Sequence, residues 1–237
     1  MRKLPLAEAI RQNQYPGTGI VAGLSSDGGS IITVFYTCAF GKEEKNRALV
    51  EDGGGVLLKS VNDLSDSEGG NVLYQPVLTF ENKILMGNGA HTEQVFDLLT
   101  AGKSFTSAVK DLNCLDDAPL FTPRITGLAD IVDGRPAFDM SVIRCAEADG
   151  SGIVRGSFSY RDVKPGSGFY IYGFSYGTTP DEAFTGEPIR IEMGMSIFDV
   201  VAEVWENLRA DARVSMWARS VDISSHRAIS RIINLAR

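Results

Sequence analysis

The sequence predicts an α+β fold, a four-layer αββα sandwich in which two antiparallel sheets pack face to face between outer helices. About ten short apolar runs follow one another, and many are joined by hairpin-type turns such as Asp27-Gly28 and Asp133-Gly134. Helical periodicity is limited to the first residues, a pair in the middle and the C-terminal part. Strands in such a succession bury both faces when two sheets stack and helices cover the outside.

The first third of the chain is expected to hold one helix and three strands. The helix places Leu6, Ala9 and Ile10 on one side, and Asp27-Gly28 between two apolar runs predicts a hairpin. The expected elements are a helix within Lys3 to Gln14, strands Gly19 to Leu24, Ser30 to Cys38 and Val56 to Val61, a charged loop Gly41 to Asn46, and a mobile polar loop Asn62 to Gly70.

The rest of the chain is expected to continue with strands interrupted by two helical regions and closed by a helix. Gly102 splits the first region, and Ser104 is placed to cap its second half. Ser196 with Asp199 forms a capping-box pattern at the second region. The strands are Val72 to Phe80, Lys83 to Met86, Ile125 to Val132, Ala137 to Cys145, Ile153 to Tyr160, Phe169 to Phe174 and Val214 to Trp217; the helices are Thr92 to Leu112, Ser196 to Ala210 and Ser224 to Leu235.

The composition is that of a globular protein, and we expect one domain over residues 1–237. The chain is 43% hydrophobic and 22% charged, and it contains no internal repeat or linker. Its net charge of −7 argues against nucleic-acid binding, which needs a basic surface. Apolar runs of membrane length and a signal peptide are both lacking. We therefore expect a cytoplasmic protein without nucleic-acid or membrane partners, assembled as a homo-oligomer.

The cysteines and histidines are few and scattered. Cys38, Cys114 and Cys145 are odd in number and widely spaced, which predicts no disulfide framework, a reducing compartment and three small core residues. The two histidines, His91 and His226, are far apart, and no Cys or His cluster has ligand spacing. The sequence therefore predicts no metal site.

The segment Asn88 to Glu93 is the strongest local candidate for a ligand site. It joins an apolar strand to a helical pattern, so free backbone N–H groups and the helix dipole would favour an anionic ligand. Asn88 and His91 would then lie at the mouth of a cleft. The alternative is an ordinary helix start with incidental polar residues.

Other polar residues could carry chemistry, although each also has an ordinary structural explanation. Arg47 follows the charged loop and could clamp a phosphate or orient a carbonyl, or it could be a solvated surface residue. Tyr74 could present its phenol to a cleft or simply pack in a strand. Arg124 could bind a ligand or pair with Asp116 and Asp117, which are themselves acid/base candidates.

Six short pieces of this chain resemble one known family in the family's order. They are Tyr15-Pro16-Gly17 with Gly23, Asn46-Arg47, Leu73-Tyr74-Gln75-Pro76, Asn88-Gly89-Ala90-His91-Thr92-Glu93, Asp117-Ala118-Pro119 with Thr122-Pro123-Arg124-Ile125, and Phe184-Thr185-Gly186-Glu187-Pro188. Together they resemble the archaeal-type inosine monophosphate (IMP) cyclohydrolases and their bacterial relatives. The resemblance spans roughly residues 15 to 190, and the Asn-Gly-x-His-Thr and Thr-Pro-Arg-Ile pieces are its most specific parts.

The resemblance implies a fold similar to the N-terminal-nucleophile hydrolases and the last step of purine synthesis, by an enzyme classed among hydrolases of cyclic amidines. In that step the carboxamide nitrogen of 5-formamidoimidazole-4-carboxamide ribonucleotide (FAICAR) attacks the formyl carbon, and loss of water gives IMP. No cofactor is implied. By motif, Arg47 and Tyr74 resemble catalytic positions, and Asp117 is the acid/base candidate. Residues implied to bind the purine ribonucleotide are Asn46, Asn88, Gly89, His91, Thr92, Thr122 and Arg124.

One departure from the family pattern concerns catalysis. Leu115 stands where relatives commonly carry a glutamate, so either Asp116 or Asp117 supplies the carboxylate or the chemistry is weakened or changed. The leading hypothesis is an IMP cyclohydrolase. The alternative is a purine-ribonucleotide binding protein that is non-catalytic or altered in activity. A third possibility, an amidohydrolase, would need Cys38 or Ser25 as nucleophile.

Overall fold

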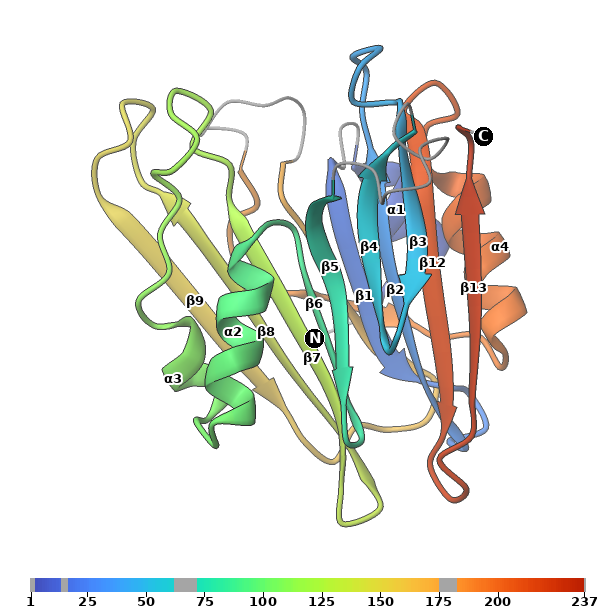
Figure 1. Ribbon diagram of the computed structural model, residues 1–237. Coiled ribbons are helices and arrows are strands. Elements are labelled where there is room, and N and C mark those ends of the chain that lie inside the picture. The colour runs from blue at the N-terminus through green and yellow to red at the C-terminus, as the bar shows by residue number, and fades with distance from the viewer. Residues whose placement is uncertain (1–2, 14–16, 62–71, 175–182, 237) are drawn as a thin grey trace.

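The computed structural model describes residues 3–13, 17–61, 72–174 and 183–236, and two antiparallel sheets form its centre (Figure 1). The strands in these residues are β1 (Thr18–Leu24), β2 (Ser30–Cys38), β3 (Arg47–Asp52), β4 (Gly55–Ser60), β5 (Val72–Phe80), β6 (Lys83–Gly87), β7 (Arg124–Val132), β8 (Arg135–Cys145), β9 (Ile153–Tyr160), β10 (Ser167–Tyr172), β11 (Ile189–Glu192), β12 (Arg213–Asp222) and β13 (Ala228–Asn234). One sheet has the order β11-β10-β1-β2-β12-β13, and the other runs from β3 to β9 in sequence order.

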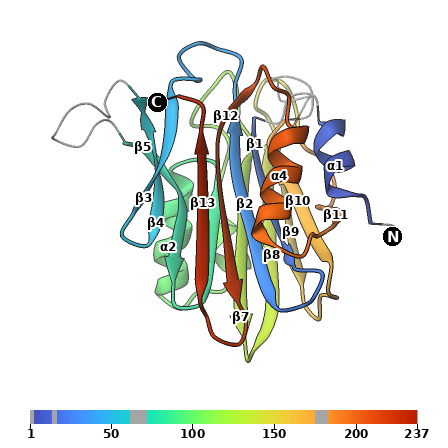
Figure 2. The same cartoon turned by 90° about the vertical axis from the view of Figure 1, so that its right-hand side faces the viewer.

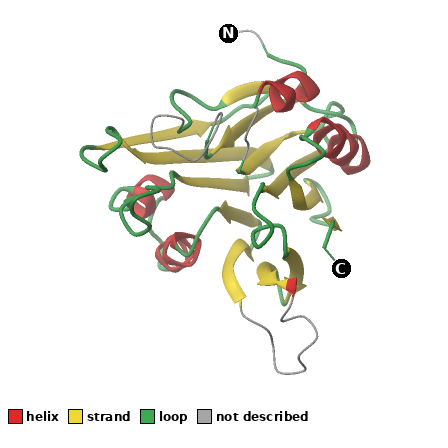
Figure 3. Ribbon diagram, turned by 90° about the horizontal axis from the view of Figure 1, so that it is seen from above, coloured by secondary structure: helices red, strands yellow, loops and turns green. Residues whose placement is uncertain are grey.

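Helices cover the outer face of each sheet, so the molecule has four layers (Figures 1 and 3). The helices α1 (Leu6–Gln12) and α4 (Ile197–Asn207) share an apolar cluster with β1, β2, β10 and β12. The helices α2 (His91–Thr100) and α3 (Phe105–Val109) share another with β6, β7 and β8. A third cluster, containing Phe35 and Met140, lies between the sheets. The predicted stacking of two antiparallel sheets inside helices is confirmed, whereas the likeness to N-terminal-nucleophile hydrolases stays a prediction.

The two helices on the six-stranded sheet lie side by side (Figure 2). The backbone N–H of Ala7 on α1 donates a hydrogen bond of 2.9 Å to the carboxylate of Glu203 on α4. The capping box predicted for α4 is present, because Ser196 accepts from the N–H of Asp199 and Asp199 accepts from the N–H of Ser196. The predicted split of the central helical region, with Ser104 as cap of α3, is also confirmed.

The predicted C-terminal helix, Ser224 to Leu235, is wrong, because this segment forms β13 in a hairpin with β12. The carboxylate of Asp222 accepts hydrogen bonds from the N–H groups of Ser224 and Ser225, which closes the turn. Ile232 packs against the core between the sheets, and Ile233 packs against the outer cluster. Neighbouring residues of β13 are thus buried on opposite sides of the sheet. Successive residues of a strand point to opposite faces, whereas an amphipathic helix buries a single stripe of residues three or four apart.

Two further strands were not predicted, β3 and β11. β3 ends in the acidic pair Glu51-Asp52 and is followed by Gly53-Gly54, so its sequence resembles a loop. It pairs with β4 to form a hairpin at the edge of the seven-stranded sheet. Arg47, expected at the exit of the charged loop, is the first residue of this strand. The predicted mobile loop Asn62 to Gly70 lies outside the described residues.

The prediction about cysteines needs correction, because Cys114 and Cys145 form a disulfide. Their Cα atoms lie 6.4 Å apart although 31 positions separate them in the chain. The segment after α3 returns to the end of β8, and spacing along the chain does not reveal such a contact. Cys38 is a free, buried cysteine. The cysteines therefore no longer support the expected reducing compartment. Across the described ranges, no helix combines the length and apolarity needed to cross a membrane.

Candidate active site

A cavity of about 700 Å³ opens at the end of the sandwich where β1 and β3 begin and β2 ends, the upper end in Figure 1. Five of the predicted site residues line it, and they come from four separate segments of the chain. These residues are Arg47, Tyr74, Asn88, Asp117 and Thr122. The fold therefore brings together in one place all three residues predicted to be catalytic and two of those predicted to bind the substrate.

Arg47 and Tyr74 lie on strands of the same sheet. Arg47 begins β3, and Tyr74 lies on β5, where it packs against the core between the sheets. Burial raises the pKa of Tyr74 to about 12, although the charge of Arg47, a hydrogen bond with Thr18 and the charge of Arg124 all act to lower it. The Tyr74 phenol is therefore neutral at pH 7 and can donate a proton or a hydrogen bond.

The loop between α3 and β7 carries Asp117 into the cavity. One carboxylate oxygen of Asp117 accepts a hydrogen bond of 3.0 Å from the N–H of Thr122 and lies 3.7 Å from the guanidinium of Arg124. The side chain of Asp116 is 72% exposed, while that of Asp117 is 34% exposed. Asp116 and Leu115 are not among the cavity residues. Of the two carboxylates that could replace the family glutamate, Asp117 is therefore the one that faces the cavity.

Asn88 links the strand–helix junction to the start of β7. Its amide nitrogen donates to the carbonyl of Pro123 at 2.8 Å, and its amide oxygen accepts from the N–H of Ile125 at 2.9 Å. Both contacts fix the backbone on either side of Arg124. Asn88 thus shapes the cavity wall by holding a neighbouring segment, in addition to lining the cavity itself.

The rest of the predicted junction does not line the cavity. His91 is buried; its Nε2 atom is 3.3 Å from the carbonyl of Ile125, and its Nδ1 atom has no hydrogen-bond partner among the described residues. Burial, and then the charge of Arg124, lower the pKa of His91 to about 4. The hydroxyl of Thr92 donates to the carbonyl of Gly89 at 2.7 Å. Gly89, His91, Thr92 and Arg124 are all absent from the lining of the cavity.

Two other expectations for this region fit the structure less closely. The N–H groups of Thr92 and Glu93 donate to the carbonyls of Gly89 and Ala90, so they are not the free donors expected at the start of α2. Asn46 lines a separate surface depression, together with three other residues of the charged loop.

The cavity also contains residues that the sequence did not single out. Thr18 forms a hydrogen bond with the Tyr74 side chain, and Phe40, a residue that is 42% exposed, also lines the cavity. The guanidinium of Arg209 lies over the Phe40 ring, 4.7 Å from its centre. A flat apolar ring at a cavity wall suits stacking on a heterocycle. The signal in the sequence was an aromatic residue two positions after a buried strand, which is too common to indicate a site.

The nucleophiles considered for an amidohydrolase are poorly suited to that role, although Cys38 lines the cavity. Burial raises the pKa of the Cys38 thiol to about 12, so the reactive thiolate is scarce at pH 7. Ser25 is buried at the β1–β2 turn, where its hydroxyl donates to Asp27, and it does not line the cavity. In the part of the chain that the structure describes, no group of three or more His, Cys, Asp or Glu residues could hold a metal ion.

Comparison with known proteins identifies the family of the chain. A comparison with curated proteins finds no match. The family model described as IMP cyclohydrolase-like protein matches residues 15–225, which include every residue of the cavity. A match over most of the chain establishes the family. The chain belongs to the family of IMP cyclohydrolase-like proteins.

Proposed function

We propose that this protein is an IMP cyclohydrolase that closes the purine ring of FAICAR. The observation that carries the proposal is the meeting of Arg47, Tyr74 and Asp117 at one cavity of about 700 Å³. The family match supports it as well. The cavity is of the size that holds a drug-sized or nucleotide-sized ligand.

The reaction needs little beyond orientation and charge stabilisation. A bond forms between the carboxamide nitrogen and the formyl carbon, and the former carbonyl oxygen of the formyl group carries negative charge in the transition state. That oxygen then leaves as water with one hydrogen from the carboxamide nitrogen and one from the formamide nitrogen. Because both reacting groups belong to one molecule, holding them at attack distance supplies much of the rate.

In this proposal each of the three side chains has a separate role. Arg47 donates hydrogen bonds to the developing oxyanion. Tyr74, which is neutral at pH 7 because its pKa is about 12, gives its proton to the departing oxygen. Asp117, in place of the family glutamate, accepts a proton from the carboxamide nitrogen and passes it to the same oxygen, and the formamide N–H proton returns to the Tyr74 phenolate, so that water leaves and both side chains regain their starting protonation states.

The proposed binding residues divide into two groups. Asn88 and Thr122 line the cavity, so we assign them direct contact with the nucleotide. Gly89, His91, Thr92 and Arg124 do not line the cavity, and we assign them support of the binding surface. Asn46 would act from the neighbouring loop. The homo-oligomer expected from the sequence stays a prediction.

The test is an absorbance assay of ring closure with purified wild type and three variants, Arg47→Gln, Tyr74→Phe and Asp117→Asn. Removing one oxyanion donor typically lowers kcat by about 10²–10³-fold, so we expect a loss of this size for Arg47→Gln. Loss of a general acid or base should cost about 10²–10⁴-fold. Arg135→Gln is the control, because Arg135 and its partner Asp162 are exposed. Equal rates in wild type and Arg47→Gln would refute the proposal.

The alternative, a purine-ribonucleotide binding protein without turnover, is motivated by Leu115. This residue stands at the family's glutamate position and is 45% exposed, outside the cavity. Calorimetry with IMP separates the two functions. Binding of IMP by wild type without any ring closure in the assay supports the alternative. Binding together with turnover that depends on Asp117 supports the enzyme.

A further inference from the structure

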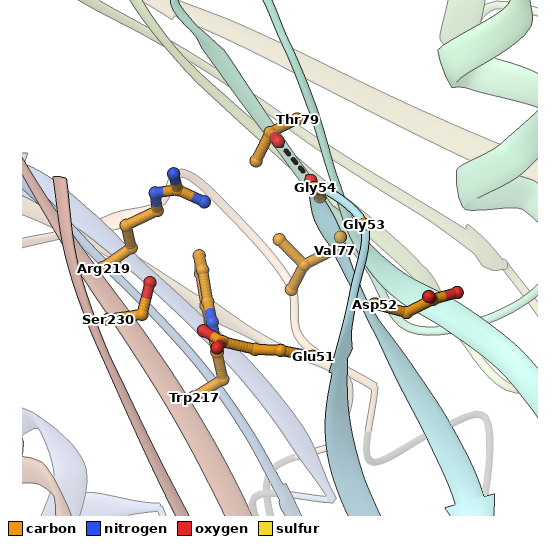
Figure 4. A pocket seen from close by; sticks show the side chains of 10 residues that line it. Glu51, Asp52, Gly53, Gly54, Val77, Thr79, Trp217, Arg219 and Ser230 are labelled. Carbon is orange, nitrogen blue, oxygen red and sulfur yellow. Dashed lines mark hydrogen bonds between the residues drawn. The ribbon is translucent and has the colours of Figure 1, made fainter.

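The two ends of β3 lie at different cavities. Its last residues, Glu51 and Asp52, line a cavity of about 310 Å³ together with the β3–β4 turn (Figure 4). This smaller cavity shares no lining residue with the active-site cavity, which Arg47 lines at the other end of the strand. The loop before Arg47, from Gly41 to Asn46, therefore belongs to the active-site end of the molecule.

One residue of this loop brings a further charge to the active-site cavity. Gly41 and Glu44 line that cavity. The separate surface depression is lined by the other four residues of the loop, which are Lys42, Glu43, Lys45 and Asn46. Among the charged residues of the loop, which the structure describes throughout, only Glu44 is thus part of the cavity lining.

Backbone and side-chain contacts hold the loop in place. The N–H of Lys45 donates to the carbonyl of Gly41 at 3.1 Å, which closes a turn within the loop. The N–H of Ala39 donates to the carbonyl of Ala212 at 2.8 Å, and the Lys45 ammonium group donates to the carbonyl of Asp211. The segment that follows α4 thus anchors the chain on both sides of Glu44.

The carboxylate of Glu44 folds back over Gly41. A side chain at Gly41 would overlap one of the carboxylate oxygens, so glycine leaves room for the carboxylate in this place. The backbone of Gly41 lies outside the left-handed region that would by itself favour glycine. Within the described ranges, the Glu44 carboxylate takes part in no ion pair or hydrogen bond. Glu44 is thus an acceptor at the cavity wall whose oxygens are open to a ligand.

The nucleotide of the proposed reaction offers this acceptor one kind of donor. Its phosphate is negative and repels a carboxylate. Its amide N–H groups lie at the reacting end, where Arg47, Tyr74 and Asp117 are proposed to act. The ribose hydroxyls are the remaining donors, and a carboxylate accepts charge-assisted hydrogen bonds from such groups. Acidic side chains bind ribose hydroxyls in the same way in dinucleotide-binding sites.

We infer that Glu44 binds the ribose hydroxyls and makes the cavity selective for nucleotides with an intact ribose over their deoxy forms. The inference rests on the proposed function, because it takes the purine ribonucleotide as the ligand. Repulsion by the Glu44 carboxylate also keeps the phosphate away from this part of the wall. Glu44 contacts a part of the nucleotide that does not react, so its role is specificity and not acid or base chemistry.

The test is calorimetry of IMP, 2′-deoxy-IMP and 3′-deoxy-IMP with wild type and with variants of the loop. The measured quantity is the ratio of each deoxy dissociation constant to that of IMP. Loss of a charge in the cavity changes the affinity for all three phosphates alike, so this effect cancels in the ratio. For wild type we expect a ratio of about ten or more for at least one deoxy nucleotide, because a charge-assisted hydrogen bond is lost.

Three variants locate the source of the selectivity. Glu44→Ala should bring the ratios close to one, and it should fold, because Glu44 is exposed. Gly41→Ala should lower the ratio while the charge is kept, since the new side chain displaces the carboxylate. Glu43→Ala is the matched control and should keep the wild-type ratio, because Glu43 is exposed and lines the depression instead of the cavity.

The outcomes separate the role of Glu44 from the proposed function. Ring closure of FAICAR by wild type, combined with the same ratios in Glu44→Ala and wild type, overturns the role of Glu44 and leaves the enzyme intact. Loss of selectivity in Glu44→Ala, in a protein that binds IMP without turnover, supports the role of Glu44 and refutes the enzyme. A wild-type protein that does not bind IMP, or that binds all three nucleotides equally, overturns the inference.

Discussion

The guanidinium of Arg124 lies 3.7 Å from the carboxylate of Asp117, and this ion pair ties the acidic loop to the first residue of β7. Asp117 lines the cavity, whereas Arg124 does not, and only 12% of the Arg124 side chain is exposed. In the proposed mechanism Arg124 therefore acts through its neighbours: it orients Asp117. Its charge also counteracts the rise in the pKa of Tyr74 and lowers the pKa of His91.

Arg124→Gln should lower kcat for ring closure by about tenfold or more, because a charge-assisted contact to Asp117 is lost. The KM for FAICAR should change less, since Arg124 does not line the cavity. Arg135→Gln, which breaks an exposed pair, should leave both constants unchanged. A large rise in KM at unchanged kcat would show instead that Arg124 binds the substrate directly.

Asn88→Ala should lower the free energy of unfolding by about 1–3 kcal/mol, because the N–H of Ile125 and the carbonyl of Pro123 both lose their partner. Asn88→Asp keeps the acceptor for Ile125 and loses the donor to Pro123, so its effect should be smaller. Urea denaturation of wild type, Asn88→Ala and Asn88→Asp measures the order of their free energies of unfolding. Equal stability of Asn88→Ala and wild type would show that these contacts do not hold the segment.

The low pKa of His91 predicts a loss of stability in acid. In the folded protein this pKa is about 4, against 6.5 for an ordinary histidine, so below pH 6.5 the unfolded chain binds more protons at this residue. The free energy of unfolding should therefore fall by about 2 kcal/mol between pH 7 and pH 5 on account of His91. His91→Gln should flatten this part of the pH profile, and His226→Gln, an exposed-turn control, should not. Parallel profiles for wild type and His91→Gln would contradict the assignment.

The disulfide predicts a simple thiol count. Protein denatured without reductant should show one reactive thiol, that of Cys38, and protein denatured after reduction should show three. The folded protein should react slowly, because Cys38 is buried and its pKa is raised to about 12. Three thiols without reductant would show that Cys114 and Cys145 are not joined in the isolated protein.

The elements predicted correctly are those whose local pattern agrees with their final packing. The bounds of β2, β5 and β9 coincide with the expected runs, and the cap of α4 was readable from Ser196 and Asp199. The motif pieces that resemble the family singled out Arg47, Tyr74 and Asp117, and these three residues line one cavity.

The elements that were missed depend on partners far along the chain. β3 is held at its edge by Asn234, whose amide accepts from the N–H of Leu49 and donates to its carbonyl across 185 positions. β13 is a strand because β12 lies beside it, although its isoleucines also fit a helix. The disulfide and the contribution of Phe40 to the cavity likewise follow from tertiary contacts, which no local pattern encodes.

The central claim is that Arg47 and Tyr74 act on the same reacting oxygen in one cavity. A double-mutant cycle of Arg47→Gln and Tyr74→Phe, measured as kcat/KM for FAICAR ring closure, tests it most directly. We predict that the double variant loses clearly less activity than the product of the two single losses, because each residue works only in the presence of the other. Losses that multiply independently, or no ring closure by the wild-type protein, would contradict the claim.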